Sequence, residues 1–465
     1  MLFNSLQFLI FFMVVTLLFF RLKSQKARVM LLLLSSCYFY MSFVYQYILI
    51  LGFTIIIDYI AGILIERTTG KTKKAWLVAS IVANAGILIF YKYFNFLVDN
   101  INTALQLFDT GREIPFINII LPIGLSFHTF QAMSYTIEVY WGKQKAERNF
   151  PTYALYVMFY PQLVAGPIER PQNILHQLNN FQPYTKNNVR EGISRMLWGY
   201  FKKVVIADRL AMAVDHIYAH DGQMSSFTLC IGAILYSFQI YCDFSGYSDI
   251  GIGAAKVMNI KLMENFKQPY LSQNISSFWS RWHISLSSWF RDYVYIPLGG
   301  NRKGEARRKF NVFTVFFLSG FWHGANWTFG IWGFLHGVLA TFVPGKKMER
   351  ESTKINNAAV VLNIILTFLA VTLLWIFFRA ENIAHAWAYI KGIFSFRHGS
   401  NDMGMSWAEL TFSFLLIGTM LWREYKWPAH FITSKNKYIF YVSSMIIILY
   451  FFGVFSENQF IYFQF

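Results

Sequence analysis

The chain has 465 residues, of which 55% are hydrophobic and only 14% are charged. Soluble domains carry about 25% charged residues, so this composition excludes an ordinary water-soluble protein and indicates that lipid covers part of the apolar surface. The net charge of +17 comes from short basic clusters between apolar runs, which is typical of cytoplasmic loops facing anionic headgroups and not of a nucleic-acid groove.

Ten apolar stretches approach the roughly 20 residues that a membrane-spanning helix needs. They lie near 3–20, 29–43, 47–65, 76–98, 117–140, 195–213, 226–245, 357–378, 407–422 and 437–455. Basic residues follow the first stretch instead of preceding it, so we interpret it as a retained helix and not as a signal peptide. Residues 153–168 are short and rich in Pro and Gly, which favours a re-entrant or interfacial segment.

A further apolar stretch, 311–341, is interrupted by Gly320, His323, Gly324 and Asn326. It is either one long tilted helix or two shorter helices broken at residues 322–324. Placing every basic cluster, including 186–203, in the cytoplasm gives a consistent topology if 311–341 enters and leaves the membrane on the same side; both termini then lie outside. The sequence therefore predicts an all-α polytopic membrane protein with about 10–12 transmembrane helices in a single membrane domain over residues 1–465.

The polar residues that suggest chemistry concentrate in 236–341, the predicted catalytic core. Asp243 and Asp249 end an apolar span, and acidic groups at membrane depth normally face a cavity or a partner. A structural tie to Arg281 or Arg291 is favoured over direct chemistry for both. Asp243 is also a candidate to line a substrate path.

The next segment, SSFWSRWHISLSSWFRDYVYIPLGGNRKG, interleaves tryptophans with charged residues. Such a mixture suits the membrane boundary, where aromatic rings take the interface and charges reach water. Residues 297–300 should form a turn. Arg291, Arg302 and Lys303 lie around it and are candidates to hold the phosphates of a nucleotide-bearing donor.

His323 lies deep in an apolar stretch, where most lone histidines are structural. A buried neutral imidazole can also take a proton, and Gly320 and Gly324 would let a substrate or another chain approach closely. His283 and His336 supply two further imidazoles in the same region. The chain has no GxSxG elbow, HExxH pair, P-loop or dinucleotide fingerprint, so direct transfer with a histidine base is the simplest chemistry.

Two motifs at this spacing, SRWHISLSSWFRDYVYIPLGGNRKG and SGFWHGANWTFGIWGFLHG, resemble the signature of the membrane-bound O-acyltransferase superfamily. The segments MLFNSLQFLIFF, GPIERPQN (166–173) and FIYFQF (460–465) are similar to the branch that contains alginate and peptidoglycan O-acetyltransferases. The resemblance runs over essentially the whole chain.

This resemblance implies a ring of helices around a central funnel or tunnel, in the plasma (inner) membrane of a bacterium. It implies that His323 is the catalytic histidine and that His283 occupies a second characteristic polar position. Trp282, Trp322 and Asn326 are candidates to line the substrate path, with Asn326 or His283 stabilising the oxyanion. The donor would be cytoplasmic acetyl-CoA, with no tightly bound cofactor and no metal. An extracytoplasmic SGNH-hydrolase-type partner would place the acetyl group on a polysaccharide hydroxyl.

The C-terminal FIYFQF tail has two interpretations. By resemblance to teichoic acid systems, Tyr462 would carry the acyl group as a covalent relay; alternatively it is an interfacial aromatic residue. Three other functions stay open: a D-alanyl transferase fed by an acylated carrier protein, a transporter or flippase for a lipid-linked sugar, and a scaffold for a polysaccharide synthase. The acceptor polymer cannot be read from the sequence.

Overall fold

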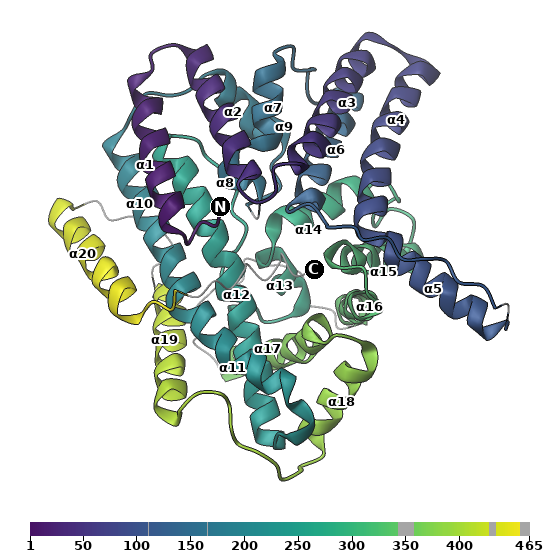
Figure 1. The fold of residues 1–465 in the computed structure, drawn as a ribbon, viewed down its shortest axis with the longest axis vertical. Helices are drawn as coiled ribbons and strands as arrows, with labels where there is room; N and C mark the ends of the chain where they lie inside the picture. Colours follow the sequence, from purple (N-terminus) through teal and green to yellow (C-terminus); the bar gives the residue numbers. More distant parts are fainter. Residues whose placement is uncertain (110, 165, 343–357, 427–433, 456–465) are drawn as a thin grey trace. The chain divides into compact units, whose positions relative to one another are not determined.

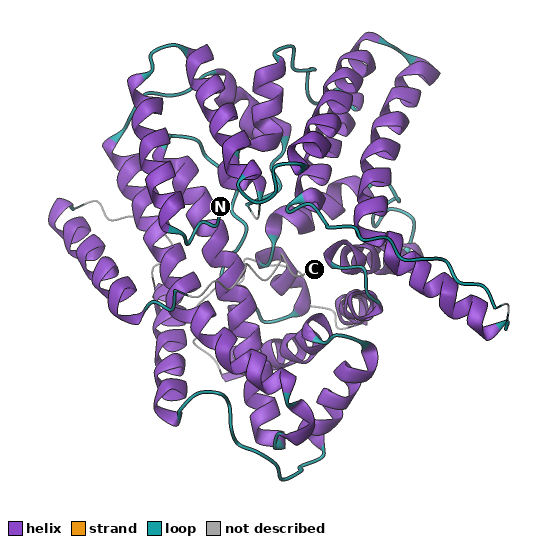
Figure 2. Cartoon of the chain, in the orientation of Figure 1, coloured by secondary structure: helices purple, strands orange, loops and turns teal. Residues whose placement is uncertain are grey.

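The computed structural model describes residues 1–109, 111–164, 166–342, 358–426 and 434–455. Helices joined by loops make up these residues, and the only β-type pairing within them is an isolated bridge between Met224 and Ser400 (Figure 2). Tyr462 and the FIYFQF tail lie outside the described residues. The predicted all-α class is confirmed.

The chain divides into two compact units, Met1–Val189 with Ala254–Met263, and Arg190–Gly253 with Glu264–Phe465. The helices of the first unit are α1 (Leu6–Arg21), α2 (Gln25–Met41), α3 (Tyr47–Arg67), α4 (Gly70–Leu88), the π-helix η1 (Ile89–Tyr93), α5 (Phe94–Leu107), α6 (Leu125–Tyr140), α7 (Phe150–Met158), α8 (Tyr160–Leu163) and α9 (Pro171–Asn179) (Figure 1). The single domain over residues 1–465 and the ring around a funnel stay predictions.

The predicted span at 117–140 is wrong at its beginning, because α6 starts only at Leu125 and residues 111–122 are not helical. Pro115 and Pro122 lie in this stretch, and proline cannot donate the backbone hydrogen bond that a helix interior needs. Asparagine side chains of α5 replace the missing helical hydrogen bonds. The side-chain oxygen of Asn102 accepts the backbone N–H of Ile114 at 2.8 Å, and its side-chain N–H donates to the Ile114 carbonyl at 2.9 Å. The apolar character of 117–124 therefore does not indicate a helix.

The second unit contains the predicted catalytic core apart from residues 254–263. Its helices are α10 (Lys186–Tyr200), the π-helix η2 (Phe201–Ala207), α11 (Asp208–Ala219), the 3-10 turn η3 (Asp221–Gln223), α12 (Ser226–Val257), the 3-10 turn η4 (Pro269–Leu271), α13 (Ile275–Arg281), α14 (Ile284–Phe290), the π-helix η5 (Arg291–Tyr295), α15 (Glu305–His323), α16 (Trp327–Phe342), α17 (Ala358–Arg379), α18 (Ile383–Phe394), α19 (Trp407–Lys426) and α20 (Lys435–Phe452). Buried aromatic and aliphatic side chains of η2, α11, α12, α13, α16 and α17 form its core.

Four helical segments in the described part of the chain are long and apolar enough to cross a membrane: Tyr47–Arg67, Gly70–Leu107, Ser226–Val257 and Ala358–Arg379. Helix α1 is also apolar but shorter. Because a hydrocarbon core of about 30 Å needs about 20 helical residues, these segments make the chain a multi-pass membrane protein.

Two glycine pairs allow α10 and α12 to pack backbone against backbone. A Cβ added at Gly199 would lie 2.6 Å from the carbonyl oxygen of Gly246, and one at Gly253 would lie 2.6 Å from that of Gly192. The two contacts are seven residues apart along both helices, so they lie on one face of each helix. This close approach brings the lysines that follow α10 against the carboxylates of α12.

The stretch 311–341 forms two helices, α15 and α16, which separate after His323, as the second of the two predicted alternatives proposed. They pack side by side (Figure 1). A Cβ at Gly320 would meet the carbonyl oxygen of Phe329 at 2.2 Å, and one at Gly324 would meet the Phe329 ring at 2.1 Å. The space predicted beside these glycines for a substrate is therefore filled by α16.

Gly333 of α16 also packs closely against the backbone of α15, so a substitution at this position tests the packing of the two helices. In Gly333→Ala the new Cβ would lie 2.3 Å from the carbonyl oxygen of Phe316, so the two helices must move apart. Overpacking of this kind costs about 1–3 kcal/mol, and we expect a lower melting temperature in detergent. Gly418→Ala is the matched control because nothing lies within 4 Å of its added Cβ; equal melting temperatures for the two variants would contradict the packing argument.

Candidate functional site

His323 is the last residue of α15, and the chain leaves the helix at Gly324, whose backbone is extended with φ −160°. The side chain is buried, with 3% of its surface exposed. Its ring meets those of Trp322, Trp332 and Phe378 edge to face, with centroid distances of 5.0, 5.2 and 5.2 Å. The end of α15 thus places an imidazole inside an aromatic enclosure from which bulk water is excluded.

A second imidazole, His283, lies beside it. The rings of His283 and His323 are 6.4 Å apart, although the residues come from different helices. The His283 ring also meets Trp322 at 5.9 Å and Phe244 of α12 at 4.7 Å. Burial lowers the pKa of His283 to about 3, so the ring is neutral at physiological pH. The structure thus brings together the two histidines that the sequence singled out separately.

Asn265 is a member of this site that the sequence analysis missed. Its side-chain oxygen lies 3.1 Å from Nδ1 of His283 and accepts a hydrogen bond of 2.9 Å from the hydroxyl of Ser285. It stands 18 positions before His283, in a segment without periodic pattern. No sequence signal of spacing or composition would have found it.

Trp282 and Trp322, both predicted to line a substrate path, are buried in this aromatic cluster. Trp282 has 1% of its surface exposed and stacks on Phe278 at 5.6 Å while meeting Trp375 at 5.0 Å. The ring of Trp322 instead contacts the rings of both His283 and His323. Of the two tryptophans, Trp322 is therefore the one in contact with the candidate site.

His336, the third imidazole, is held in a different way. Its Nδ1 accepts a hydrogen bond of 3.2 Å from the indole N–H of Trp279. The ring of Trp332 meets His336 at 4.9 Å and His323 at 5.2 Å. His336 therefore belongs to the aromatic wall behind His323.

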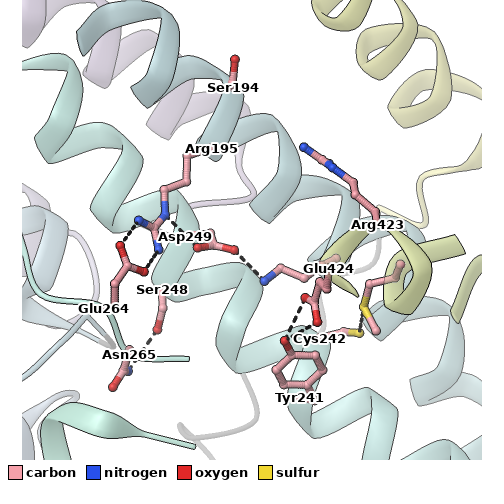
Figure 3. Close-up of polar contacts among 12 residues, drawn as sticks. Ser194, Arg195, Tyr241, Cys242, Ser248, Asp249, Glu264, Asn265, Arg423 and Glu424 are labelled. Atoms are coloured by element: carbon pink, nitrogen blue, oxygen red, sulfur yellow. Dashed lines mark hydrogen bonds and ion pairs between the residues drawn. The ribbon is translucent and has the colours of Figure 1, made fainter. Parts of the chain in front are cut away.

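The acidic residues of α12 are structurally tied, as expected, and the ion pairs that the structure shows for them run to basic residues of α10 and η2. Asp243 pairs with Lys203 at 2.6 Å. Asp249 pairs with Lys202 at 2.6 Å and with Arg195 at 2.8 Å (Figure 3). The expected partner Arg291 is exposed and pairs with its neighbour Asp292 at 2.8 Å. The sequence analysis assigned 186–203 to a cytoplasmic cluster, whereas the structure buries Lys202 and Lys203 almost completely.

The buried charges continue towards α19 and towards the segment that carries Asn265. Arg195 also binds Glu264 through two hydrogen bonds of 2.6 and 2.5 Å. The hydroxyl of Tyr241 donates to the carboxylate of Glu424, 2.8 Å away. Figure 3 shows the contacts of Arg195 and Asp249 as one group and the contact between Tyr241 and Glu424 as another. Paired in this way, the charges stabilise the helix arrangement instead of standing free for chemistry.

The three predicted phosphate-binding residues share one exposed part of the second unit. Arg291 begins η5, while Arg302 and Lys303 lie in the turn that follows. The turn predicted at 297–300 is confirmed: the N–H of Gly300 donates to the carbonyl of Tyr295 at 2.9 Å, and Gly299 and Gly300 have positive φ. The basic side chains are therefore accessible to an anionic ligand.

Asn326 bridges the break between α15 and α16. Its side-chain N–H donates to the carbonyl of Glu381 at 2.8 Å, and its side-chain oxygen accepts the backbone N–H of Thr328 at 2.9 Å. This arrangement is that of a helix cap. It favours a structural role for Asn326 over the predicted oxyanion contact.

A buried pair of imidazoles, one of which ends α15, is an arrangement suited to acyl transfer with a histidine base. The exposed basic turn lies at the other end of the same helix, before Glu305. Residues 142–343 match the model of the membrane-bound O-acyltransferase family. The chain is 40% identical over 403 residues to the probable alginate O-acetylase AlgI of Pseudomonas aeruginosa, covering 85% of this chain and 75% of that protein. The chain belongs to this family and is an acyltransferase.

Two further relatives have other names. The peptidoglycan O-acetyltransferase of Helicobacter pylori is 35% identical over 390 residues, covering 78% of this chain and 73% of that protein. The teichoic acid D-alanyltransferase of Bacillus subtilis is 29% identical over 269 residues, or 54% of this chain and 67% of that protein. The resemblance inferred from the motifs is thereby confirmed.

Proposed function

We propose that this protein moves an acetyl group from cytoplasmic acetyl-CoA across the bacterial inner membrane for the O-acetylation of an extracytoplasmic polysaccharide. The observation that carries the proposal is the buried pair of His283 and His323, 6.4 Å apart. The relatives named as alginate and peptidoglycan acetyltransferases support the acyl group and the class of acceptor. The acceptor is accordingly an alginate-like exopolysaccharide or peptidoglycan.

In this mechanism His323 is the general base. It takes the proton of an acceptor hydroxyl while that oxygen attacks the thioester carbonyl, and the carbon–sulfur bond then breaks. The proton passes to the departing CoA thiolate, which leaves His323 neutral for the next cycle. A positioned general base contributes about 10²–10⁴-fold to such a step.

The exposed basic turn is the proposed binding site for the phosphates of acetyl-CoA. Arg291, Arg302 and Lys303 are all accessible there. Arginine pairs with phosphate oxygens in a two-pronged geometry, and lysine adds a point charge. This assigns donor binding to the cytoplasmic side, in agreement with the placement of basic loops inside the cell.

The acetyl group would leave on the opposite side, where an SGNH-hydrolase-type partner places it on the polymer. Tyr462 is the proposed covalent relay between His323 and that partner; the alternative is an interfacial tyrosine without a chemical role. The partner, and not this chain, would then select the polysaccharide.

Transfer from radiolabelled acetyl-CoA to the purified protein tests the proposal. We expect label on the wild type and none on Tyr462→Phe or His323→Ala. Label retained by Tyr462→Phe alone would remove the relay but keep the base. Wild-type protein that neither binds acetyl-CoA nor releases CoA from it would overturn the proposed donor.

A second candidate is supported by the relative named teichoic acid D-alanyltransferase. In that function the same imidazoles would act on a thioester carried by an acyl carrier protein. Offering both thioesters to the purified chain separates the two, because only the true donor releases its thiol at a rate that depends on His323. Lipid-linked sugar transport without thiol release would instead indicate the flippase alternative.

A further inference from the structure

We propose that Asn265 is a positioning residue that fixes the tautomer of His283, so that this imidazole accepts a proton or hydrogen bond during transfer and does not donate to the oxyanion. The inference rests on the proposed function, because it gives His283 a role in that reaction. The inference also goes beyond the proposed function, since neither the motifs nor the comparisons assign any role to Asn265.

Three donors converge on the side-chain oxygen of Asn265. They are Nδ1 of His283 at 3.1 Å, the backbone N–H of Ser285 at 3.3 Å and the hydroxyl of Ser285 at 2.9 Å. All three residues are fully buried. A backbone N–H can only donate, so the atom that faces it must be the amide oxygen and not the amide nitrogen. The orientation of the amide is thereby determined by its surroundings.

This orientation decides which nitrogen of His283 carries the hydrogen. The Ser285 hydroxyl lies 3.4 Å from Nδ1 but only 2.9 Å from the amide oxygen, to which it donates. Because that amide oxygen can only accept, we assign the hydrogen of the neutral ring to Nδ1. Nε2 then holds the lone pair. A neutral ring in this tautomer has no second N–H to offer to an oxyanion, so the assignment of His283 as an oxyanion donor loses its chemical basis.

Asn265 also holds the backbone that carries the ring. His283 has φ 44° and ψ 53°, a left-handed conformation that non-glycine residues rarely adopt. The next residue, Ile284, donates its N–H to the carbonyl of Asn265 at 2.9 Å. The side-chain N–H of Asn265 donates to the hydroxyl of Ser248 on α12, 3.2 Å away (Figure 3). The strained turn is thus tied to the long helix α12 through one asparagine.

Burial leaves the His283 ring neutral, and no charged group contributes to the lowering of its pKa. The carboxylates that adjoin Asn265 and Phe244 in the sequence are paired: Glu264 with Arg195, and Asp243 with Lys203. The rings that face His283 are the indole of Trp322, the imidazole of His323 and the phenyl of Phe244. In the proposed reaction Nε2 of His283 serves as a hydrogen-bond acceptor while His323 carries the proton, which afterwards leaves with the CoA thiol.

Two variants of similar size separate positioning from packing. Asn265→Leu removes the acceptor, and we expect CoA release from acetyl-CoA to fall by about 10–100-fold, as for other residues that orient a reacting imidazole. The KM for acetyl-CoA should stay within about twofold, because the donor site is elsewhere. Asn265→Asp keeps an acceptor for Nδ1, so we expect it to retain more activity than Asn265→Leu.

The pH profile of Asn265→Asp provides a readout that a purely structural role would not change. A carboxylate beside Nδ1 favours the charged imidazolium and raises the pKa of His283. An imidazole acts as an acceptor only when neutral, so activity should be lost as the pH falls through this raised value. We therefore expect the acidic limb of the Asn265→Asp profile to lie at a higher pH than that of the wild type; superimposable profiles would overturn the inference.

Asn274→Ala is the matched control, because Asn274 caps α13 by accepting the N–H of Ser277 at 2.8 Å. It should keep the wild-type pH profile. The nitrogen-15 solid-state spectrum of histidine-labelled protein, assigned with His283→Gln, then tests the tautomer without any activity. A neutral ring protonated at Nδ1 supports the inference, and one protonated at Nε2 overturns it. If the wild type shows the signal of a ring protonated at Nδ1 but releases no CoA from acetyl-CoA, the proposed donor is refuted and the tautomer assignment still holds.

Discussion

Replacing His323 with alanine is expected to lower acetyl transfer by about 10²–10⁴-fold, the contribution of a positioned general base. The side chain is buried among Trp322, Trp332 and Phe378, so no water-borne base can readily replace it. The measurement is CoA release from acetyl-CoA by the purified protein, together with its elution profile in detergent, which reports whether the variant is folded.

His336→Gln provides a control in the same aromatic surroundings. Glutamine can still accept the hydrogen bond that Trp279 donates to His336, and His336 is not placed among the reacting groups. This variant should keep transfer within about tenfold of the wild type. Transfer by His323→Ala at the wild-type rate would refute the role of His323 as the base.

Lys203→Met should cause the largest loss of stability. Lys203 lies between Asp243 at 2.6 Å and Asp208 at 2.8 Å, and all three side chains are buried. Removing one partner of a buried ion pair typically costs about 3–5 kcal/mol, because the remaining charge is left uncompensated. The expected result is a much lower melting temperature in detergent and a lower yield of folded protein.

Charge compensation gives the control for this prediction. Replacing Lys203 with Met together with Asp243→Asn and Asp208→Asn removes all three charges and should recover part of the lost stability. The exposed pair of Arg308 and Glu305 offers the opposite comparison, since breaking an exposed ion pair has little effect. If Lys203→Met melted like Arg308→Met, the buried triad would not stabilise the fold.

The sequence predicted the apolar helices well because their physical cause is local. The run predicted near 357–378 is apolar enough to span a membrane wherever it occurs, and the structure forms α17 (Ala358–Arg379) there. The break after His323 was one of two alternatives that the glycines and polar residues of 320–326 left open. The apolar run at 117–124 gave the wrong result because hydropathy does not register the prolines that remove backbone donors.

The polar partners were less predictable because they depend on tertiary geometry. Lys202 and Lys203 read as the end of a cytoplasmic cluster, yet the close packing of α10 on α12 buries both against Asp249 and Asp243. Asn265 lies in an irregular segment, where no periodicity relates it to His283. Histidines could be nominated by residue type and family resemblance, whereas the residue that orients one of them required coordinates.

The π-helix η2 makes the fold sensitive to the insertion or deletion of single residues. Its seven residues, Phe201–Ala207, are all buried, and it ends with a hydrogen bond from the N–H of Asp208 to the carbonyl of Lys203, five positions earlier. Two adjacent lysines reach different carboxylates of α12 from this wider turn. Deleting or inserting one residue would rotate everything beyond it by about 100° and separate these pairs. Substitutions away from the two lysines are therefore easier to accommodate here than changes in length, and a gap at this place in an alignment would mark a relative with a different scheme of buried charges.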